Sequence, residues 1–240
     1  MEEAVATLRK GGILLYPTDT IWGIGCDATD ADAVERVFGI KQRSDAKSLI
    51  VLASDMDMVA RYVREIPEMA VTLESLNDKP LTIIYPEGVG LASNVTAEDG
   101  SIAIRIPKCR FCVELVRRFG KPIVSTSANV SGSPAPKKYA DISESIMSAA
   151  DMCVDPSLDV DSTGRPSSIF SKAGENSQTR LEHSQNSLCF EYFSSRGVAG
   201  NFYFVAGRTA WQKNYKSSSK YDNAGGNKTF FRCCCSIFMG

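Results

Sequence analysis

Short apolar runs of strand length alternate with amphipathic, helix-forming segments along most of this chain. The apolar runs predict strands at 13–16, 49–53, 81–85, 101–106, 123–124 and 152–154, with a last strand that ends at 170. Apolar residues at helical spacing predict helices at 2–10, 31–40, 54–63, 67–76, 109–119 and 142–149. Because strands and helices take turns, we expect an α/β fold in which helices flank a twisted sheet of mixed parallel and antiparallel strands.

The size and composition of the chain limit what it can do. Its 240 residues can form one sizeable core with an appendage, and a formal net charge of −1 gives no overall attraction to nucleic acid. No apolar run approaches the roughly 20 residues of a membrane span, and the acidic N-terminus is unlike a secretory signal. We therefore expect a cytoplasmic protein with no membrane partner, whose eight cysteines are thiols. The single histidine, His183, argues against a Ser-His-Asp triad or a histidine metal site.

The regularity of the sequence is lost in the C-terminal part of the chain. From about Ser171 the apolar pattern degrades, and the sequence that follows is rich in Ser, Asn and Lys with scattered aromatic residues. We expect a folded domain over residues 1–181 and an irregular C-terminal extension over residues 182–240. A non-native origin, for instance a shifted reading frame, is favoured for the extension.

Clusters of hydroxyl side chains lie at the ends of predicted strands. They are Thr18 and Thr20, Ser125 and Ser127, and Ser167 and Ser168. In open α/β sheets, ligands bind where loops leave the strand ends, so these hydroxyls are expected to form the rim of a site for a polar small molecule. Each cluster taken alone also fits an ordinary turn or surface loop.

Several cations are placed to reach the same region. Arg43 and Lys47 lie in the loop before the strand at 49–53, and Arg105 belongs to the strand at 101–106. Cations at a helix end also suit the helix dipole, and Arg105 either faces solvent or lines a cavity. Hydroxyls combined with Lys and Arg suit a phosphorylated or carboxylate ligand whose charge they stabilise.

A Cys-x-x-Cys pair, Cys109 and Cys112, opens the predicted helix at 109–119. No second pair follows at zinc-finger spacing. A redox role and a packing role both remain open for this pair, and packing is favoured.

Five blocks of sequence carry these features in a fixed order. They are Tyr16–Gly25, Lys41–Lys47, Ser101–Pro107, Ser125–Gly132 and Gly164–Ile169. In order and spacing the blocks resemble the YrdC/Sua5 family, over roughly residues 3–170. Members of that family are threonylcarbamoyl-AMP synthases, which make an adenylate from L-threonine, bicarbonate and ATP and release pyrophosphate. The resemblance therefore implies a nucleotidyltransferase of tRNA t6A modification, with the t6A transferase machinery downstream and tRNA or RNA as a further partner.

The resemblance also implies roles for individual residues. The ATP-binding residues would be Arg43, Lys47, Ser101 and Ser127. The threonine-binding residues would be Thr20, Arg105, Ser125 and Ser167. Arg43 and Lys47 would also be catalytic, and Arg105 would pair with the threonine carboxylate. Magnesium would arrive with ATP, and no protein-bound metal is expected.

Some positions depart from the family pattern. Leu52 stands where archaeal and yeast members often carry a threonine-contacting His, and Ala135 replaces an ATP-contacting serine. The closing Arg of the family has only a doubtful equivalent in Arg180.

Two other classes of function share this fold. One is a YrdC-like module that binds double-stranded RNA or ribosomes without synthase activity, and its members tend to lose the Lys-x-Arg-x-x-x-Lys and Ser-Ala-Asn features kept here. The other is a carbamoyl-transfer domain of hydrogenase maturation, which comes joined to acylphosphatase and zinc-finger modules that this chain lacks. The retained motifs favour the synthase.

Overall fold

A single mixed sheet runs through the molecule. The computed structural model describes residues 1–42, 49–173, 187–193 and 199–205. Within these residues the sheet has ten strands in the order β7-β1-β2-β6-β3-β5-β4-β8-β10-β9. The strands are β1 (Leu14–Tyr16), β2 (Gly23–Gly25), β3 (Ile50–Leu52), β4 (Leu81–Tyr85), β5 (Ile102–Arg105), β6 (Ile123–Ser127), β7 (Met152–Cys153), β8 (Ser168–Ala173), β9 (Ser187–Phe193) and β10 (Ala199–Val205).

The strands pair in both directions, as the sequence predicted. β7 runs parallel to β1, β5 to β3 and β8 to β4. The other neighbours are antiparallel, including β2 with β1 and β6, and β4 with β5. The expected α/β fold with a mixed sheet is therefore confirmed.

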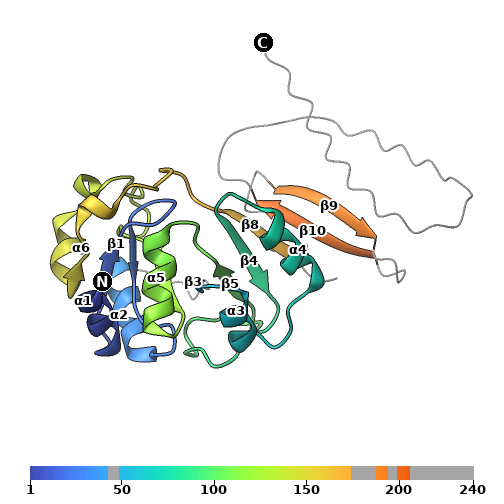
Figure 1. The fold of residues 1–240 in the computed structure, drawn as a ribbon, viewed down its shortest axis with the longest axis horizontal. Helices are drawn as coiled ribbons and strands as arrows, with labels where there is room; N and C mark the ends of the chain where they lie inside the picture. Colours follow the sequence, from blue (N-terminus) through green and yellow to red (C-terminus); the bar gives the residue numbers. More distant parts are fainter. Residues whose placement is uncertain (43–48, 174–186, 194–198, 206–240) are drawn as a thin grey trace, which may run out of the picture.

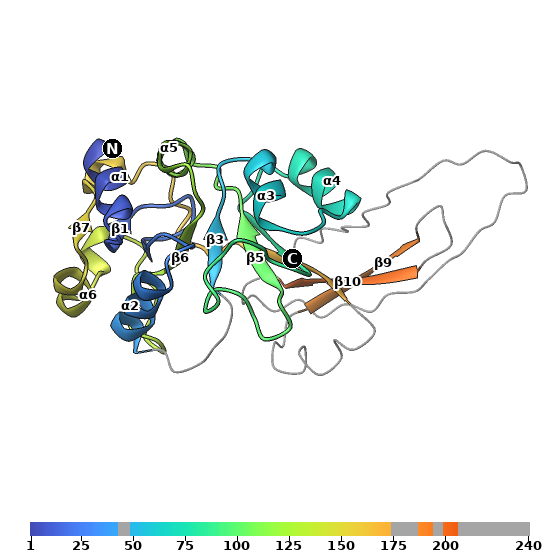
Figure 2. The ribbon, with the colours of Figure 1, turned by 90° about the horizontal axis from the view of Figure 1, so that it is seen from below.

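Helices cover both faces of this sheet. They are α1 (Glu2–Arg9), α2 (Ala31–Lys41), α3 (Met56–Tyr62), α4 (Glu68–Leu76), α5 (Arg110–Phe119) and α6 (Glu144–Ala149), with short 3-10 turns η1 (Tyr139–Asp141) and η2 (Pro156–Leu158). Figure 1 shows α5 lying across the sheet between the α1 end and the α4 end of the molecule. Seen from below, α1, α5, α3 and α4 lie on one side of the sheet, and α2 and α6 on the other (Figure 2).

Local sequence explains where the helices begin. The Asp30 carboxylate accepts hydrogen bonds from the backbone N–H groups of Asp32 and Ala33, at 3.0 and 3.2 Å, and so caps α2. Asp55 caps α3 in the same way, accepting from the N–H of Met58 at 2.8 Å. These short side chains satisfy N–H groups that the first turn of a helix leaves without a partner.

The first two strands form the centre of one half of the core. Leu14, Leu15, Tyr16, Trp22 and Ile24 are all fully buried. Such runs are buried on both sides, which is why they read as continuous apolar sequence rather than as alternating sequence.

β6 is longer than the sequence predicted. A strand was expected only at 123–124, but pairing continues through Ser125 to Ser127. Ser125 pairs with Ile50 of β3, and Ser127 pairs with Gly23 of β2. Neighbouring strands on both sides supply partners for the polar backbone, so the hydroxyl-rich sequence remains a strand despite its loop-like composition.

The C-terminal extension differs from its predicted irregular structure in the part that the structure describes. β10 pairs with β8, and β9 pairs with β10, both antiparallel. Their sequences, SLCFEYF and AGNFYFV, are rich in aromatic residues, which favour strands. The proposed boundary at 181 stays a prediction.

Among the described residues, no helix has the length and apolar character needed to cross a membrane.

Candidate active site

One cavity of about 420 Å³ lies where the hydroxyl clusters meet, a volume typical of small-molecule sites. Its described lining is Thr18, Thr20, Ile21, Gly23, Leu49, Ile50, Ile84, Ala103, Arg105, Ser125, Thr126, Ser127, Pro166, Ser167 and Ile169. Hydroxyls, one cation and aliphatic side chains therefore share the wall.

The register of the sheet explains why residues distant in sequence line one cavity. Across four neighbouring strands, one row consists of Ser125, Ile50, Ala103 and Ile84. Arg105 lies two residues along β5 from Ala103 and so points to the same face of the sheet. One face of β6, β3, β5 and β4 thus forms the floor, with a small residue at Ala103 leaving room above it.

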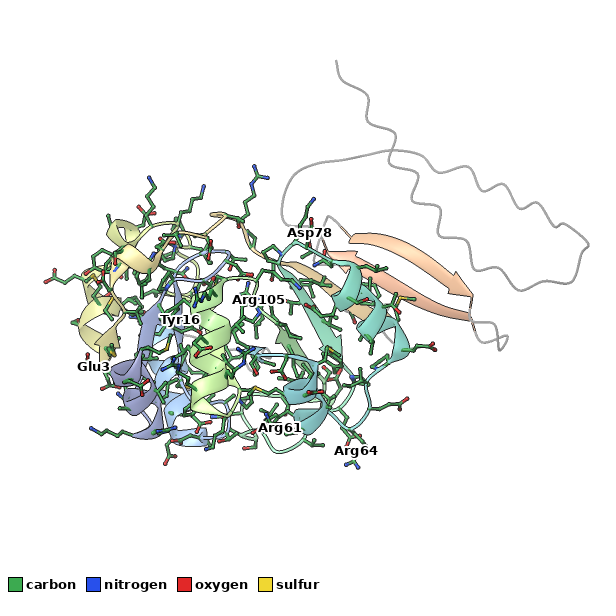
Figure 3. The ribbon with its side chains drawn as sticks, in the orientation of Figure 1. Glu3, Tyr16, Arg61, Arg64, Asp78 and Arg105 are labelled. Atoms are coloured by element: carbon green, nitrogen blue, oxygen red, sulfur yellow. The ribbon has the colours of Figure 1, made fainter. Side chains whose placement is uncertain are left out.

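The Arg105 side chain lies within this floor, so the cavity alternative left open by the sequence is the one observed. Arg105 is 5% exposed, and its Nη1 donates to Thr20 Oγ1 at 2.9 Å. Figure 3 shows Arg105 near the middle of the molecule, beside α5. A buried guanidinium whose Nε has no hydrogen-bond partner among the described residues is suited to bind an anionic group in the cavity.

Thr18 holds the Thr20 segment in shape. Thr18 Oγ1 lies 2.8 Å from Thr20 Oγ1, donates to the carbonyl of Ile21 at 2.7 Å, and accepts from the N–H groups of Thr20 and Ile21. Pro17 ends β1, and the following residues close a tight turn on the Thr18 hydroxyl. This turn presents the Thr20 hydroxyl to Arg105.

Asp19 lies beside Arg105 but outside the cavity lining. Its Oδ1 is 3.7 Å from Arg105 Nη2, and its Oδ2 accepts from the N–H of Lys108 at 2.9 Å. Both side chains of the pair are nearly fully buried. Each therefore supplies the opposite charge that the other needs in the interior.

Ser167 is positioned by a residue of β4. Thr82, which is fully buried, places its Oγ1 2.8 Å from Ser167 Oγ. The loop before Ser167 is tied to the Thr18–Thr20 turn, because Ser162 Oγ donates to the carbonyl of Thr20 at 2.8 Å and the Thr163 N–H donates to the carbonyl of Asp19 at 3.2 Å. The β8 wall of the cavity is thus joined to the β1–β2 wall.

Lys41 anchors the loop that follows β6. It is 3% exposed, and its Nζ donates to the carbonyls of Ser127 and Asn129 at 2.6 and 2.8 Å. The Ser131 N–H in turn donates to the Lys41 carbonyl at 2.9 Å. The end of α2 therefore fixes the place of Ser127 at the cavity.

The structure brings together most, but not all, of the residues predicted for the site. Those that line the cavity are Thr20, Arg105, Ser125, Ser127 and Ser167. Ser101 does not line it; its Oγ donates to Asp99 Oδ1 at 2.6 Å. Arg43 and Lys47 lie outside the described residues, and so does Arg180. Leu52 is fully buried in β3 and Ala135 is exposed, which places neither in the lining.

Among the described residues that line the cavity, no side chain is an evident acid or base. Burial raises the pKa of the nearby Tyr16 hydroxyl well above its usual value. Burial likewise raises the pKa of Cys112, whereas the neighbouring Cys112 side chain lowers the pKa of Cys109. Neither cysteine lines the cavity, both are buried, and Cys112 Sγ donates to the Pro17 carbonyl at 3.3 Å, which fits packing.

The described residues also offer no group of three or more His, Cys, Asp or Glu side chains that could hold a metal ion.

Sequence reasoning did not assign roles to Asp19, Lys41 and Thr82. Lys41 stands at a helix end, where a cation is ordinary, and Thr82 looks like any polar residue in an alternating strand. Asp19 was visible in the Thr-Asp-Thr run, but its partner is 86 positions away in sequence, Arg105. A pairing of that kind depends on the sheet order, which sequence pattern alone does not give.

Comparison with known proteins places this chain in a family. The family model Sua5_yciO_yrdC, described as "Telomere recombination", matches residues 6–181. A protein of Stenotrophomonas maltophilia named threonylcarbamoyl-AMP synthase is 36% identical over 159 residues, which cover 65% of this chain and 85% of that protein. A protein of the same name from Chromohalobacter salexigens is 36% identical over 141 residues, covering 58% and 76%.

Solved structures share the fold. The crystal structure of P. abyssi Sua5 complexed with L-threonine has a TM-score of 0.65 and 25% identity, covering 72% of this chain and 51% of that one. This chain thus spans about half the length of the archaeal protein. E. coli YciO has a TM-score of 0.61 at 22% identity, covering 72% and 84%, and supports the fold alone. The chain belongs to the Sua5/YciO/YrdC family.

Proposed function

We propose that this chain is a threonylcarbamoyl-AMP synthase, an enzyme that forms threonylcarbamoyl-AMP and pyrophosphate from L-threonine, bicarbonate and ATP. The observation that carries the proposal is the cavity of this chain, in which a buried Arg105 lies among hydroxyls from several strands. The chain's membership of the family adds to it. Relatives that bear the synthase name and a family structure with L-threonine support it. In class it is a nucleotidyltransferase, because it transfers the AMP part of ATP.

The threonine end of the site is the floor around Arg105. Arg105 pairs with the threonine carboxylate. The hydroxyls of Thr20, Ser125 and Ser167 form hydrogen bonds with the polar groups of threonine. The aliphatic side chains of Ile21 and Ile50 offer apolar contact for its methyl group.

The remaining predicted residues are assigned to ATP in this proposal. Arg43 and Lys47 would hold the phosphates, Ser127 at the cavity would contact the nucleotide, and Ser101 would contact it from outside the described lining. Because the described residues near the cavity supply hydroxyls rather than carboxylates, they do not form a magnesium site of their own. In this proposal magnesium is carried to the enzyme by ATP.

The reaction needs no protein nucleophile. The threonine amine attacks carbon dioxide derived from bicarbonate, which forms an N–C bond and releases a proton, and a carbamate results. A carbamate oxygen then attacks the α-phosphorus of ATP, and the bond to pyrophosphate breaks. The protein contributes by holding the two substrates in line and stabilising negative charge.

The chemistry of the product indicates which reaction follows this one. Threonylcarbamoyl-AMP is a reactive mixed anhydride, so we place the chain upstream of a transferase that moves the threonylcarbamoyl group to tRNA. The cytoplasm is the proposed location, because a reducing compartment suits the free thiols found among the described residues, those of Cys26, Cys109, Cys112 and Cys153. Direct binding of tRNA or other RNA is a further proposal.

Isotopic labelling tests this function. The protein is incubated with ATP, magnesium, L-threonine and ¹³C-labelled bicarbonate, and nucleotide products are analysed by mass spectrometry. A threonylcarbamoyl-AMP peak that carries the label is expected. AMP or threonyl-AMP without the labelled carbon would refute the proposal, and an RNA-binding module would give no nucleotide product at all.

A further inference from the structure

The floor of the cavity contains a buried pair of opposite charges. The side chains of Arg105 and Asp19 are 5% and 4% exposed, with Nη2 and Oδ1 3.7 Å apart. Arg105 is the one charged residue in the described lining, and Asp19 is absent from that lining. A ligand in the cavity therefore meets a guanidinium whose charge is balanced by a carboxylate that the ligand does not touch.

The hydrogen bonds of the pair show that Asp19 acts on Arg105 mainly through charge. The distance of 3.7 Å is too long for a hydrogen bond, and neither Asp19 Oδ1 nor Arg105 Nε has a hydrogen-bond partner among the described residues. Arg105 is oriented instead by Thr20 Oγ1, which accepts from Nη1 at 2.9 Å. Asp19 thus neutralises the guanidinium without occupying its N–H donors.

We infer that Asp19 is a specificity-determining residue that makes the threonine end of the cavity electrically neutral, so that it binds a zwitterionic amino acid and disfavours ligands of net negative charge. The inference rests on the proposed function, because it takes an amino acid to be the occupant of this end.

Electrostatics within the protein supports this preference for a zwitterion over an anion. The carboxylate of a ligand beside Arg105 is attracted by the guanidinium and repelled by Asp19, and both effects remain strong in a poorly screened interior. The ammonium group of a zwitterion offsets the repulsion, whereas a phosphate or a simple carboxylate has nothing to offset it. The same enzyme must also bind ATP, so a neutral floor keeps phosphate groups away from Arg105.

Asp19 has a second, structural contact that the test must separate from its charge. Its Oδ2 accepts the Lys108 N–H and so ties the turn after β1 to the start of α5. Asp19→Asn keeps the shape and an oxygen acceptor for this N–H, and it removes only the charge. Asp151→Asn is a matched control, because Asp151 also accepts a backbone N–H, from Ile13 at 2.7 Å, and pairs with Arg36 at 2.9 Å, outside the cavity lining.

The experiment is isothermal titration of the full chain without ATP. The probes are L-threonine, (R)-3-hydroxybutyrate, which is threonine without its amine, and inorganic phosphate as a competitor of threonine. In the unaltered protein, threonine should bind at least about tenfold more tightly than 3-hydroxybutyrate, and phosphate should not displace it. In Asp19→Asn this preference should fall by about tenfold, which corresponds to about 1.4 kcal/mol, and phosphate should compete. Asp151→Asn should keep the original preference.

The outcomes separate the inference from the function on which it rests. If Asp19→Asn folds and keeps the preference for threonine over 3-hydroxybutyrate, or binds both ligands equally more weakly, the inference is overturned. Threonine binding by the unaltered protein would still support the proposed function in that case. If Asp19→Asn does not fold, the unaltered protein still decides, because displacement of threonine by phosphate there would also overturn the inference. Absence of threonine binding by the unaltered protein would instead contradict the proposed function and the inference together.

Discussion

Arg105 shows how a single side chain acquires its role from its position in the sheet. It ends β5, shares a face with Ala103, and is buried beside Thr20 and Asp19. Lysine could not replace it, because an ammonium lacks the planar set of donors that binds Thr20 and a ligand at once. Among the described residues Arg105 Nε has no hydrogen-bond partner, and an ion pair in the interior contributes little net stability, so we propose ligand binding as the role of this arginine.

Replacing Arg105 should therefore weaken threonine binding selectively. We expect Arg105→Gln to reduce the affinity for L-threonine by about 10- to 100-fold, since loss of a charge-assisted contact costs roughly 1.5–3 kcal/mol. Affinity for ATP should change much less. Calorimetry with each ligand measures both values, and Arg36→Gln, which breaks a partly exposed pair with Asp151, serves as the control. Equal losses for the two ligands, or none, would show that Arg105 does not contact threonine.

At the scale of elements, the contact between β2 and β6 leaves no space for a side chain at one position. A Cβ atom added to Gly25 would lie 1.8 Å from the Val124 carbonyl oxygen and 3.0 Å from the Tyr16 hydroxyl. Val124 cannot move easily, because its strand is paired on both sides. The close approach of these strands thus requires glycine.

Gly25→Ala should therefore destabilise the protein severely. We expect a loss of about 3 kcal/mol or more in the free energy of unfolding, because forced overpacking shifts backbone as well as side chains. Gly39→Ala is the matched control, since an added Cβ there has no atom within 4 Å and lies in α2, where alanine is the better helix former. Urea unfolding of both variants tests the pair. Similar stability for the two would mean that β2 and β6 are not packed as described.

The cap of α3 gives a prediction that depends on pH. Hydrogen bonds from the Met58 N–H and the Ser54 hydroxyl lower the pKa of Asp55 below its ordinary value. A carboxyl group whose pKa is lower in the folded state stabilises the fold above its unfolded pKa of about 3.9, and this contribution is lost as the pH falls through the folded value. Asp55→Ala should cost about 1 kcal/mol at pH 7.

Unfolding experiments at several pH values check this sign. The stability difference between the unaltered protein and Asp55→Ala should be constant from pH 7 to about pH 5 and should shrink below about pH 4. A difference that grows on acidification would contradict the capping role of Asp55.

At the scale of the whole molecule, the described lining of the cavity ends before the C-terminal extension begins. The last described lining residue is Ile169, and the family model ends at residue 181. We therefore expect a chain truncated after Leu181 to bind L-threonine within about threefold of the full chain, a change of less than 1 kcal/mol. A chain truncated after Gly164 is the control, because it also removes Ser167 and Ile169 and should not bind. Loss of binding in the longer truncation would show that the extension belongs to the site.

The fold was largely predictable from sequence because its strands are buried. Apolar runs such as 13–16 and 81–85, separated by capped helices, have few alternatives to an α/β sheet. The extent of β6 was missed because serine-rich sequence gives no local sign of a strand. Pairing with β2 and β3 keeps these residues in the strand. Strand order is likewise set by contacts between distant residues.

The candidate site was predictable in its hydroxyls and less so in the residues that hold them. Thr20, Ser125 and Ser167 stand out because small polar residues end apolar strands. Asp19 and Thr82 gain their importance only through partners, Arg105 and Ser167, that lie 86 and 85 positions away in sequence. Such pairs are visible only once the register of the sheet is known.

In the proposed function, this chain couples threonine and bicarbonate to the cleavage of ATP. The most direct measurement is the rate of pyrophosphate release with ATP, magnesium and L-threonine, in the presence and absence of bicarbonate, in buffer freed of dissolved carbon dioxide. Release that needs threonine and bicarbonate together is predicted, even if turnover is slow. Pyrophosphate release at the same rate without bicarbonate would identify an ordinary amino-acid adenylating activity and would contradict the proposed synthase reaction.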